Sequence, residues 1–485
     1  MRPMPRESPK MKQNSLWMAT IAALAVAVGC GGAEEDGVRH DLSQQADRFA
    51  ATSGDEAEAG DTDFSEGLPA YLAYAMAHSP ELRASFERWQ ASVHRISRSR
   101  RLPETTLSFG IFVQSVETRV GPQQARLGLQ QSFPWPTKLT AGADSASARA
   151  RAQQRRFEAE ALVVTERVSN LYWRLWQIRE SRRVHGEHIE VVRALSESVG
   201  ARVATGATTL ADQQQVDLTA ARIEDTIHGL HEAERASEAQ LRALLSAPRG
   251  ADIPTPHAPP EARLPTESHE DMMSAVANHP LIASLSWMAQ AQDEAARAQE
   301  ADRYPSFTVG VDWIITGDAA TPGVQGSGRD AVIVGAGIRL PLFQGSYSDG
   351  IDAARADANA ERAEQEAATE MALGELEAAL SAVRNSVRRV RLYHTTLVPQ
   401  AETAYASVLG AYATGRGTVA QTLLAQGTLL ELRVEQDLAR AMYAQSWARL
   451  ELVTGHNLDR GPGVDPDQAP GAPENERTEQ VDDGE

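Results

Sequence analysis

The sequence predicts a mainly α-helical fold with a small β part, and three observations support this. Residues 137–247 contain no proline and are rich in Ala, Arg, Gln, Glu and Leu, which is the composition of long helices. Two pairs of short stretches, within 106–130 and 305–340, alternate apolar and polar residues as strands do. The same order of elements recurs about 200 residues later, which indicates an internal duplication.

The predicted strands form two pairs, each joined by a polar loop. From Pro305 to Ile315 every second residue is apolar, and Ala331–Leu340 repeats the alternation. The earlier pair covers Leu107–Val113 and Arg126–Gln130, with Gln114–Gln124 as its loop. A run of about ten residues suits a tilted strand that crosses a bilayer. Four strands cannot close a membrane barrel, so three chains would have to pool twelve; two soluble hairpins packed on helices are the alternative.

The long helices are predicted to form hairpins. A helix from Thr137 to about Ala201 would be about 100 Å long, and a second helix, Leu210–Leu245, would return after a turn at Gly206. Pro399 lies inside a helical run of the second half, where it removes a hydrogen bond and should kink or break the helix. The first half has no proline at the corresponding place, so the two halves should bend differently.

Matching landmarks divide the chain into two repeats. His78-Ser79-Pro80 matches Asn278-His279-Pro280, and Ala204-Thr205-Gly206 matches Ala413-Thr414-Gly415. We therefore expect a first repeat over 67–246, a Pro-rich linker over 247–266 and a second repeat over 267–455. Two acidic segments, 30–66 and 456–485, are rich in small and polar residues and are predicted to be a disordered linker and a disordered tail.

The N-terminus has the pattern of an export signal over residues 1–29. Basic residues precede the apolar run Leu16–Val28, which is too short to span a membrane, and either Met1 or Met11 fits as the start. The run ends in Ala27-Val28-Gly29-Cys30, which is similar to a bacterial lipobox. Cys30 is the only cysteine, so we expect it to accept lipid; ordinary cleavage is the alternative.

The sequence carries no pattern of an enzyme or of a nucleic-acid-binding protein. The formal net charge is −19 and no basic patch occurs, which argues against nucleic acid. The sequence contains no phosphate-binding loop, no Gly-x-Ser-x-Gly, no His-Glu-x-x-His and no cysteine-based metal motif. We therefore expect neither catalysis nor a cofactor.

In these motifs and in their order, the chain resembles the TolC family of outer-membrane efflux proteins over about Leu68 to Leu458. The resemblance rests on the doubled order of elements, on Gly337–Phe343, on Leu397–Glu402 and on the turn at Gly415. Gln131–Pro136 looks most like the heavy-metal branch, the CzcC- and CusC-like lipoproteins.

The resemblance implies a fold and partners. Long helical hairpins would form an α-barrel that extends into the periplasm, and four membrane strands per chain would contribute to a shared trimeric β-barrel. The chain would be a homotrimer in the outer membrane, anchored by lipid, and would work with a periplasmic adaptor protein and an inner-membrane pump of the RND type.

The implied function is that of the outer-membrane channel of a tripartite efflux system, with no enzymatic activity. Metal cations are narrowly preferred as the cargo, and a duct for organic compounds or for type I secretion is the alternative. A lipid-anchored periplasmic coiled-coil scaffold without channel activity is the competing hypothesis from another class.

The two predicted turns are the candidate functional sites. In the family such turns form the periplasmic mouth and meet the adaptor, which makes four residues docking candidates: Gly206, Thr209, Gly415 and Thr418. The alternative is that they only end and begin helices. Asp212 would form an acidic ring in a trimer and favour cations, unless it only complements the helix N-terminus. Arg416 is a candidate partner for a gate carboxylate, unless it is simply solvated.

Two histidine pairs form a candidate metal site. His185 and His188 lie on the outgoing helix, and His228 and His231 lie on the returning one. Spacing of three places each pair on one helix face, and equal distances from the turn place all four at one height. Imidazole suits zinc, copper and nickel. Solvated surface histidines are the alternative.

Overall fold

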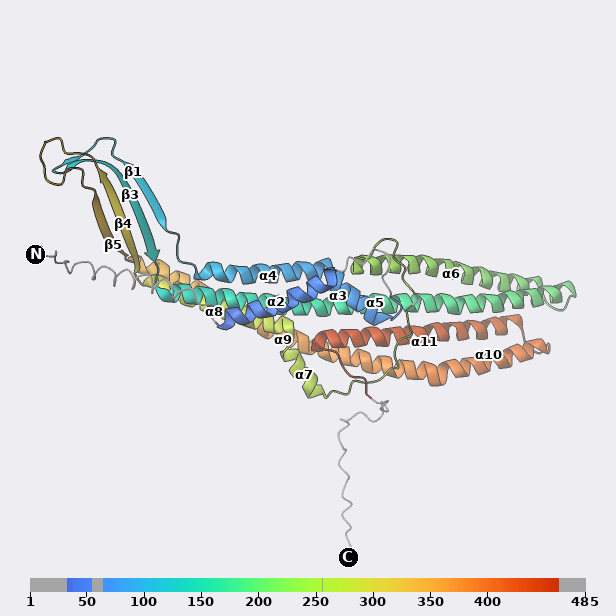
Figure 1. Ribbon diagram of the computed structural model, residues 1–485. Helices are drawn as coiled ribbons and strands as arrows, with labels where there is room; N and C mark the ends of the chain where they lie inside the picture. Colours follow the sequence, from blue (N-terminus) through green and yellow to red (C-terminus); the bar gives the residue numbers. More distant parts are fainter. Residues whose placement is uncertain (1–32, 55–63, 255, 462–485) are drawn as a thin grey trace, which may run out of the picture. The chain divides into compact units, whose positions relative to one another are not determined.

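The computed structural model describes residues 33–54, 64–254 and 256–461, and Figure 1 shows their elements. The signal segment and Cys30 lie outside the described residues, as does most of the acidic tail. In chain order the elements are α2 (Ala33–Gly54), α3 (Leu68–His78), α4 (Pro80–Arg100), β1 (Thr106–Ile111), β2 (Glu117–Thr118), β3 (Gly121–Phe133), α5 (Pro136–Ala204), α6 (Leu210–Leu245), α7 (His269–Ala277), α8 (Pro280–Glu300), η2 (Ala301–Arg303), β4 (Ser306–Thr316), β5 (Ala331–Arg339), α9 (Gln344–Leu392), η3 (Tyr393–Leu397), α10 (Val398–Ala413) and α11 (Val419–Thr454).

The described residues fall into two compact units, and each unit takes segments from both halves of the chain. The first unit contains the described part of Met1–Ala51 together with Ala84–Glu158 and Pro280–Ala368. The second contains the described parts of Thr52–Arg83, Ala159–His279 and Thr369–Glu485. The strands belong to the first unit. The second unit contains α6, α10, α11 and the C-terminal part of α5. Within the described ranges, no helix combines the length and the apolar composition that crossing a membrane requires.

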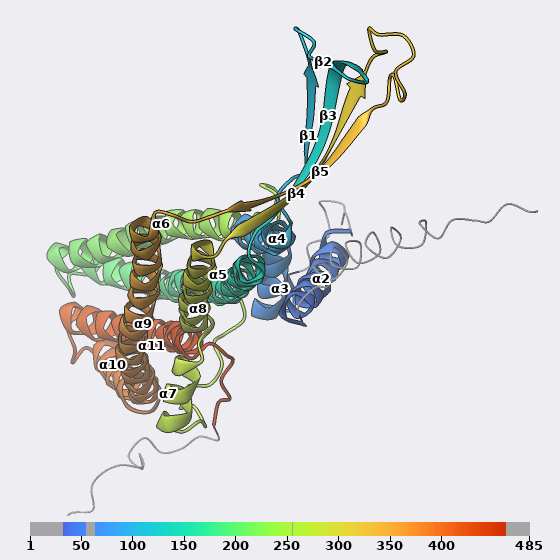
Figure 2. The ribbon, with the colours of Figure 1, turned by 90° about the vertical axis from the view of Figure 1, so that its left-hand side faces the viewer.

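The four long strands form one antiparallel sheet in the order β1-β3-β4-β5, and they lie side by side in both views (Figure 1, Figure 2). The predicted strands of the second pair are confirmed as β4 and β5. The predicted loop Gln114–Gln124 is wrong at its end, because β3 already begins at Gly121 and Gln123 pairs with Thr316. That partner comes from the other half of the chain, so the local alternation gave no sign of it.

The sheet has one apolar face and one polar face. Cross-strand neighbours lie in rows, such as Leu107, Leu129, Val311 and Val334 in order across the four strands. Apart from the half-buried Phe133, the large apolar side chains of this face are exposed: Leu107, Phe109, Ile111, Leu127, Leu129, Phe307, Val309, Val311, Trp313, Ile315, Val332, Val334 and Ile338. The other face is mainly threonine, serine and glycine, with an ion pair of 2.9 Å between Arg126 and Asp312, and its large apolar residues are Ile314, which is buried, and Ile333.

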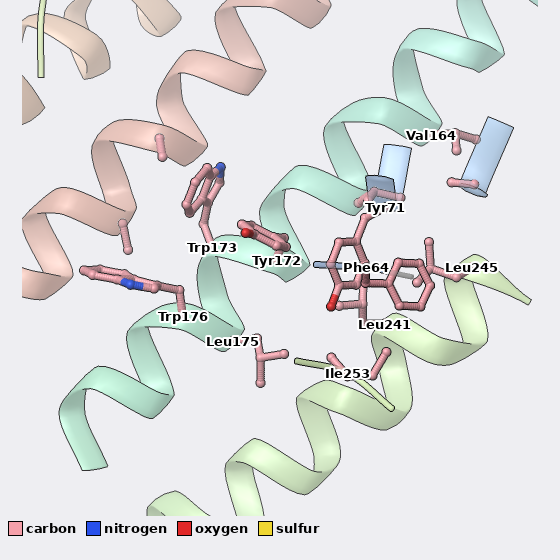
Figure 3. Packing of buried hydrophobic residues seen from close by; sticks show 14 residues of the cluster. Phe64, Tyr71, Val164, Tyr172, Trp173, Leu175, Trp176, Leu241, Leu245 and Ile253 are labelled. Carbon is pink, nitrogen blue, oxygen red and sulfur yellow. The ribbon is translucent and has the colours of Figure 1, made fainter. Parts of the chain in front are cut away.

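Two helical hairpins dominate the second unit, α5 with α6 and α10 with α11 (Figure 1). Their main core is aromatic, with the rings of Phe64 and Tyr71 stacked 4.3 Å apart and Tyr172 edge-on to Tyr71 (Figure 3). The Tyr172 hydroxyl accepts a hydrogen bond of 2.8 Å from the backbone N–H of His257, which satisfies the polar tip of a buried ring.

Pro399 interrupts the second half as predicted. A π-helical turn, Tyr393–Leu397, separates α9 from α10, and the N–H of Val398 donates to the carbonyl of Tyr393, five residues back. Pro399 follows directly in the first turn of α10, and because it has no N–H it cannot donate to a carbonyl of the preceding π-helical turn. In the first half α5 runs for 69 residues without a break, so the predicted difference between the halves is confirmed.

The prediction of disorder over 30–66 is wrong for Ala33–Gly54, which forms α2. Its buried residues Val38 and Leu42 share one helix face with Glu35, whose carboxylate pairs with Arg39 and Arg100. Acidic composition indicated disorder because two of the counter-charges, those of Arg100 and Arg151, lie far away in the sequence. Where distant basic groups pair with the acids, the charge repulsion that favours disorder is removed.

Candidate functional site

The turn between α5 and α6 begins with a glycine in the left-handed region. Gly206 has φ 73°, and its N–H donates to the carbonyl of Val203 at 3.0 Å. The N–H of Ala207 donates to the carbonyl of Arg202 at 2.8 Å. These two bonds form a Schellman motif, which satisfies carbonyls that the helix end would otherwise leave unpaired.

The same turn closes with a capping box at the start of α6. The Thr209 hydroxyl accepts from the backbone N–H of Asp212 at 3.2 Å, and the Asp212 carboxylate accepts from the backbone N–H of Thr209 at 3.1 Å. Both groups thereby satisfy amides at a helix N-terminus that have no partner within the helix. The sequence folds into a sharp reversal here because each helix end carries its own cap.

The turn between α10 and α11 repeats these contacts. Gly415 has φ 75°, and the N–H of Arg416 donates to the carbonyl of Ala411 at 2.9 Å. Thr418 and Gln421 form the second capping box. Equal hydrogen bonds at equivalent positions are what an internal duplication would leave. The two capping boxes differ in charge, since a charged Asp212 stands where the second turn has neutral Gln421.

The four docking candidates therefore all have a structural role within the turns. Gly206 and Gly415 end helices, and Thr209 and Thr418 begin them. Their loops are also exposed, as a docking surface requires. Contact with an adaptor stays a prediction.

Replacing either turn glycine by alanine should loosen the helix ends. A β-carbon at Gly206 or Gly415 would meet nothing within 4 Å, so the cost is backbone strain alone, about 1–2 kcal/mol for an L residue in the left-handed region. Hydrogen exchange of the flanking amides measures the loss. Gly229→Ala, inside α6 with the same open surroundings, is the control and should instead stabilise by about 0.5–1 kcal/mol. Equal effects at all three sites would contradict the argument.

The Asp212 carboxylate is engaged within its own turn. One of its oxygens accepts from the hydroxyls of Thr208 and Thr209 at 2.8 and 2.6 Å, and these hydrogen bonds, with that of Thr209 first, hold the pKa of Asp212 below its usual value. Arg416 is exposed, and its Nε donates to the Thr414 hydroxyl at 3.2 Å. Within the described part of the chain neither side chain forms an ion pair, so one chain does not bring the two predicted gate residues together.

Sequence reasoning missed the contact that joins the two hairpins near their turns. The Arg202 guanidinium lies 4.4 Å from the ring centroid of Tyr412 and donates to its carbonyl at 3.3 Å. Around this contact the buried residues of both hairpins form one apolar cluster: Ile189, Val192, Leu195, Val199, Val216, Ile223, Tyr412, Val419 and Leu423. The spacing of Val419 and Leu423 indicates a packing seam, but nothing in the sequence pairs it with α5.

The predicted four-histidine metal site is not formed. His185 and His188 line a cavity of about 160 Å³ together with residues of α6 and α11, whereas His228 and His231 are exposed and do not line it. Across the described ranges, no group of three or more metal-ligating side chains is close enough to hold a metal ion. Spacing gave the height of each histidine along the hairpin, but it did not give the direction in which His228 and His231 face.

His188 is buried in the wall of this cavity, with 4% of its surface exposed. Neither ring nitrogen has a hydrogen-bond partner among the described residues. Burial lowers the pKa of His188 to about 4, and the charge of Arg433 acts in the same direction. The side chain is therefore a neutral imidazole near neutral pH, held in a cavity between two hairpins.

His188 should make the protein less stable as the pH falls. Below pH 6.5 the unfolded chain binds a proton at this imidazole that the folded chain does not bind until about pH 4, so stability is lost across that range. Thermal unfolding of His188→Leu and of the wild type should be measured at pH 7.5, 5.5 and 4.5. The stability of the variant relative to the wild type should increase each time the pH is lowered. Asp437, whose pKa burial raises to about 6, titrates in both proteins and cancels in the difference. The exposed His228→Leu is the control, and a wild-type–variant difference independent of pH would refute the prediction.

Comparison with known proteins agrees with the architecture. Residues 272–456 match the family model described as outer membrane efflux protein. No curated protein matches the chain in sequence. Among solved structures, the outer membrane protein VceC of Vibrio cholerae has 20% identity and a TM-score of 0.68, covering 80% of this chain and 96% of that one.

Two further structures have the same fold. CusC, described in connection with transmembrane channel formation, has 14% identity and a TM-score of 0.69, covering 81% of this chain and 92% of its own. The CmeC outer membrane channel of Campylobacter jejuni has 15% identity and a TM-score of 0.67, covering 82% and 87%. At such identities these likenesses show the fold, which is mainly helical with a small antiparallel sheet. Residues 272–456 thus match the outer membrane efflux protein family in sequence, and the chain has the fold of the solved outer-membrane channels.

Proposed function

We propose that the chain is the outer-membrane channel of a tripartite efflux system and that three copies form the channel. The observation that carries this proposal is the sheet, whose exposed large side chains on one face are apolar across all four long strands while the other face is mainly polar. An exposed apolar surface of this extent is uncommon on a soluble protein and fits contact with lipid.

The open edges of the sheet support assembly from several copies. Among the strands that the structure describes, β1 and β5 each have a neighbour on one side only, so both would leave backbone groups unpaired in lipid. Three copies joined edge to edge would bring twelve strands into one closed barrel. The polar face, with Arg126 and Asp312, would then line the water-filled interior.

The helical hairpins would form the periplasmic part of the duct. In this proposal the turns at Gly206 and Gly415 meet a periplasmic adaptor protein, which connects the channel to an inner-membrane pump of the RND type. The support is that both turns are exposed and that each has a left-handed glycine and a capping box of the same kind. The two turns of each copy would therefore offer similar surfaces to the adaptor around the mouth of a trimer. Asp212 and Arg416 are proposed as the selectivity or gate residues of this mouth.

The proposed lipid anchor at Cys30 can be tested on its own. The sequence Ala27–Cys30 and the absence of any other cysteine support acylation. Incorporation of labelled palmitate should be lost in Cys30→Ser. If the wild type assembles in the outer membrane without incorporating labelled palmitate, the proposal of a lipid anchor is wrong and the proposed channel function still stands.

Metal cations are the proposed cargo, with organic compounds as the alternative. The support is the resemblance of Gln131–Pro136 to the heavy-metal branch. Loss of the chain from its own cell should increase sensitivity to copper, zinc or silver salts more than sensitivity to dyes and detergents. The reverse order would assign organic cargo.

The decisive experiment is single-channel recording from the purified, membrane-extracted protein in planar bilayers. We expect discrete cation-selective conductance, and Asp212→Ala should lose the selectivity if three copies form an acidic ring. If the wild type is silent, a variant without residues 203–209 and 412–419 separates two explanations. Conductance from that variant indicates a closed mouth, and silence from a folded trimer favours a lipid-anchored scaffold without channel activity.

A further inference from the structure

A cavity of about 660 Å³ lies in the first unit, where the strands meet the helices. We name it the junction cavity. Its lining includes Ser132 near the end of β3, Ser306 at the start of β4 and Arg339 at the end of β5. Leu102 and Pro103, shortly before β1, complete the set, so the helix-proximal ends of all four long strands meet here.

The junction cavity is cationic in a chain whose formal net charge is −19. Four basic side chains line it and only one acidic side chain, Asp302, does so; the basic ones are Arg98, Arg101, Lys138 and Arg339. Lys138 pairs with Asp302, and Arg101 pairs with Glu104 at 3.1 Å. Arg98 and Arg339 are exposed and have no ion-pair partner within the described part of the chain. Two unpaired guanidinium groups beside one cavity favour an anionic ligand.

The remaining lining is aromatic and apolar. The rings of Trp135 and Tyr304 stack with their centroids 5.0 Å apart. Beside them Leu342 and Phe343 are 77% and 80% exposed, and Leu340 continues the apolar alternation of β5. The cavity thus combines basic side chains with exposed apolar ones. This combination suits a molecule that has an anionic head and an apolar tail.

We propose that the junction cavity binds the phosphate headgroup of an anionic phospholipid such as phosphatidylglycerol. The proposal rests on the proposed function, which places the apolar sheet face in lipid. The helix-proximal strand ends then lie at the interface between bilayer and water, where aromatic and basic side chains gather. In a three-fold ring a neighbouring copy would present a different surface to the cavity, so contact between copies is the outcome that the test below separates from lipid binding.

Native mass spectrometry of the full chain tests this, after extraction in mixed micelles that contain phosphatidylglycerol or phosphatidylcholine. The wild type should retain phosphatidylglycerol preferentially, and Arg98→Gln with Arg339→Gln should weaken that retention by about 30-fold at low salt. Raising the salt concentration should reduce the preference, since the interaction is electrostatic. The control is Arg88→Gln with Arg384→Gln, which removes two exposed arginines that do not line the cavity and should leave retention unchanged.

Planar-bilayer conductance of the same preparations distinguishes a failure of the proposed lipid site from a failure of the proposed channel function. Conducting protein that retains both lipids equally, or that keeps its preference in the double variant, overturns the lipid site and leaves the channel intact. A double variant that loses its trimers without a change in lipid retention assigns the cavity to contact between copies, which also overturns the site. Protein that neither inserts nor conducts counts against the proposed function itself.

Discussion

Val334→Arg should abolish stable insertion of the sheet into the membrane. Val334 lies near the middle of β5 on the apolar face and is 75% exposed. A guanidinium at the bilayer midplane costs about 2–4 kcal/mol per chain, and three chains would each carry the penalty. We expect loss of urea-resistant membrane protein and of trimers that migrate as such in unheated gel samples.

Ile333→Arg is a closely matched control. The residue is adjacent in sequence, lies on the same strand and is also exposed, but it faces the polar side and stands opposite Asp312 in the register. The same charge there would enter the proposed aqueous interior beside a carboxylate, so insertion should remain near the wild-type level. If both variants insert equally well, the apolar face does not contact lipid, and the two soluble hairpins considered from the sequence become the better interpretation.

Much of the fold follows from local sequence patterns. Alternation predicted β4 and β5, because a strand with two different faces records its environment at every second residue. The turns at Gly206 and Gly415 were predictable because left-handed backbone favours glycine at a helix end. Pro399 predicted the interruption of the second half through its missing N–H.

What the sequence did not reveal depends on partners distant in the chain. Helix α2 is stabilised by Arg100 and Arg151, which pair with Glu35 and Asp41 from outside the acidic segment. The contact of Arg202 with Tyr412 joins two helices that no local pattern relates. The same limitation explains the wrong metal site, because the direction in which a side chain faces depends on which neighbour covers the helix.

Arg179→Met should cause a large loss of stability in the second unit. The guanidinium donates to Glu234 at 2.7 Å and to Glu238 at 2.6 Å, and also to the carbonyls of Ile253 and Pro254 at 3.0 and 2.7 Å. Its side chain is only 11% exposed. One residue of α5 therefore connects α6 to the Pro-rich linker. Removing it leaves the two linker carbonyls without this donor and takes the most buried partner from two carboxylates, which keep only Arg182 and Arg242. Breaking a buried pair costs about 3–5 kcal/mol.

Arg193→Met is the matched control, because Arg193 also lies on α5 and also pairs with two carboxylates, those of Glu190 and Glu224, the second of them on α6. Its side chain is 53% exposed, so the same change should cost less than about 1 kcal/mol. Thermal unfolding of both variants measures the difference, and limited proteolysis should show faster cleavage of the linker 247–266 in Arg179→Met alone. Equal losses in the two variants would mean that the number of ion pairs, and not their burial, determines how firmly the linker is held. A loss confined to Arg179→Met would show that a desolvated network fixes the linker against the first hairpin, which keeps α5 and α6 in one arrangement behind the turn that we propose as the docking site.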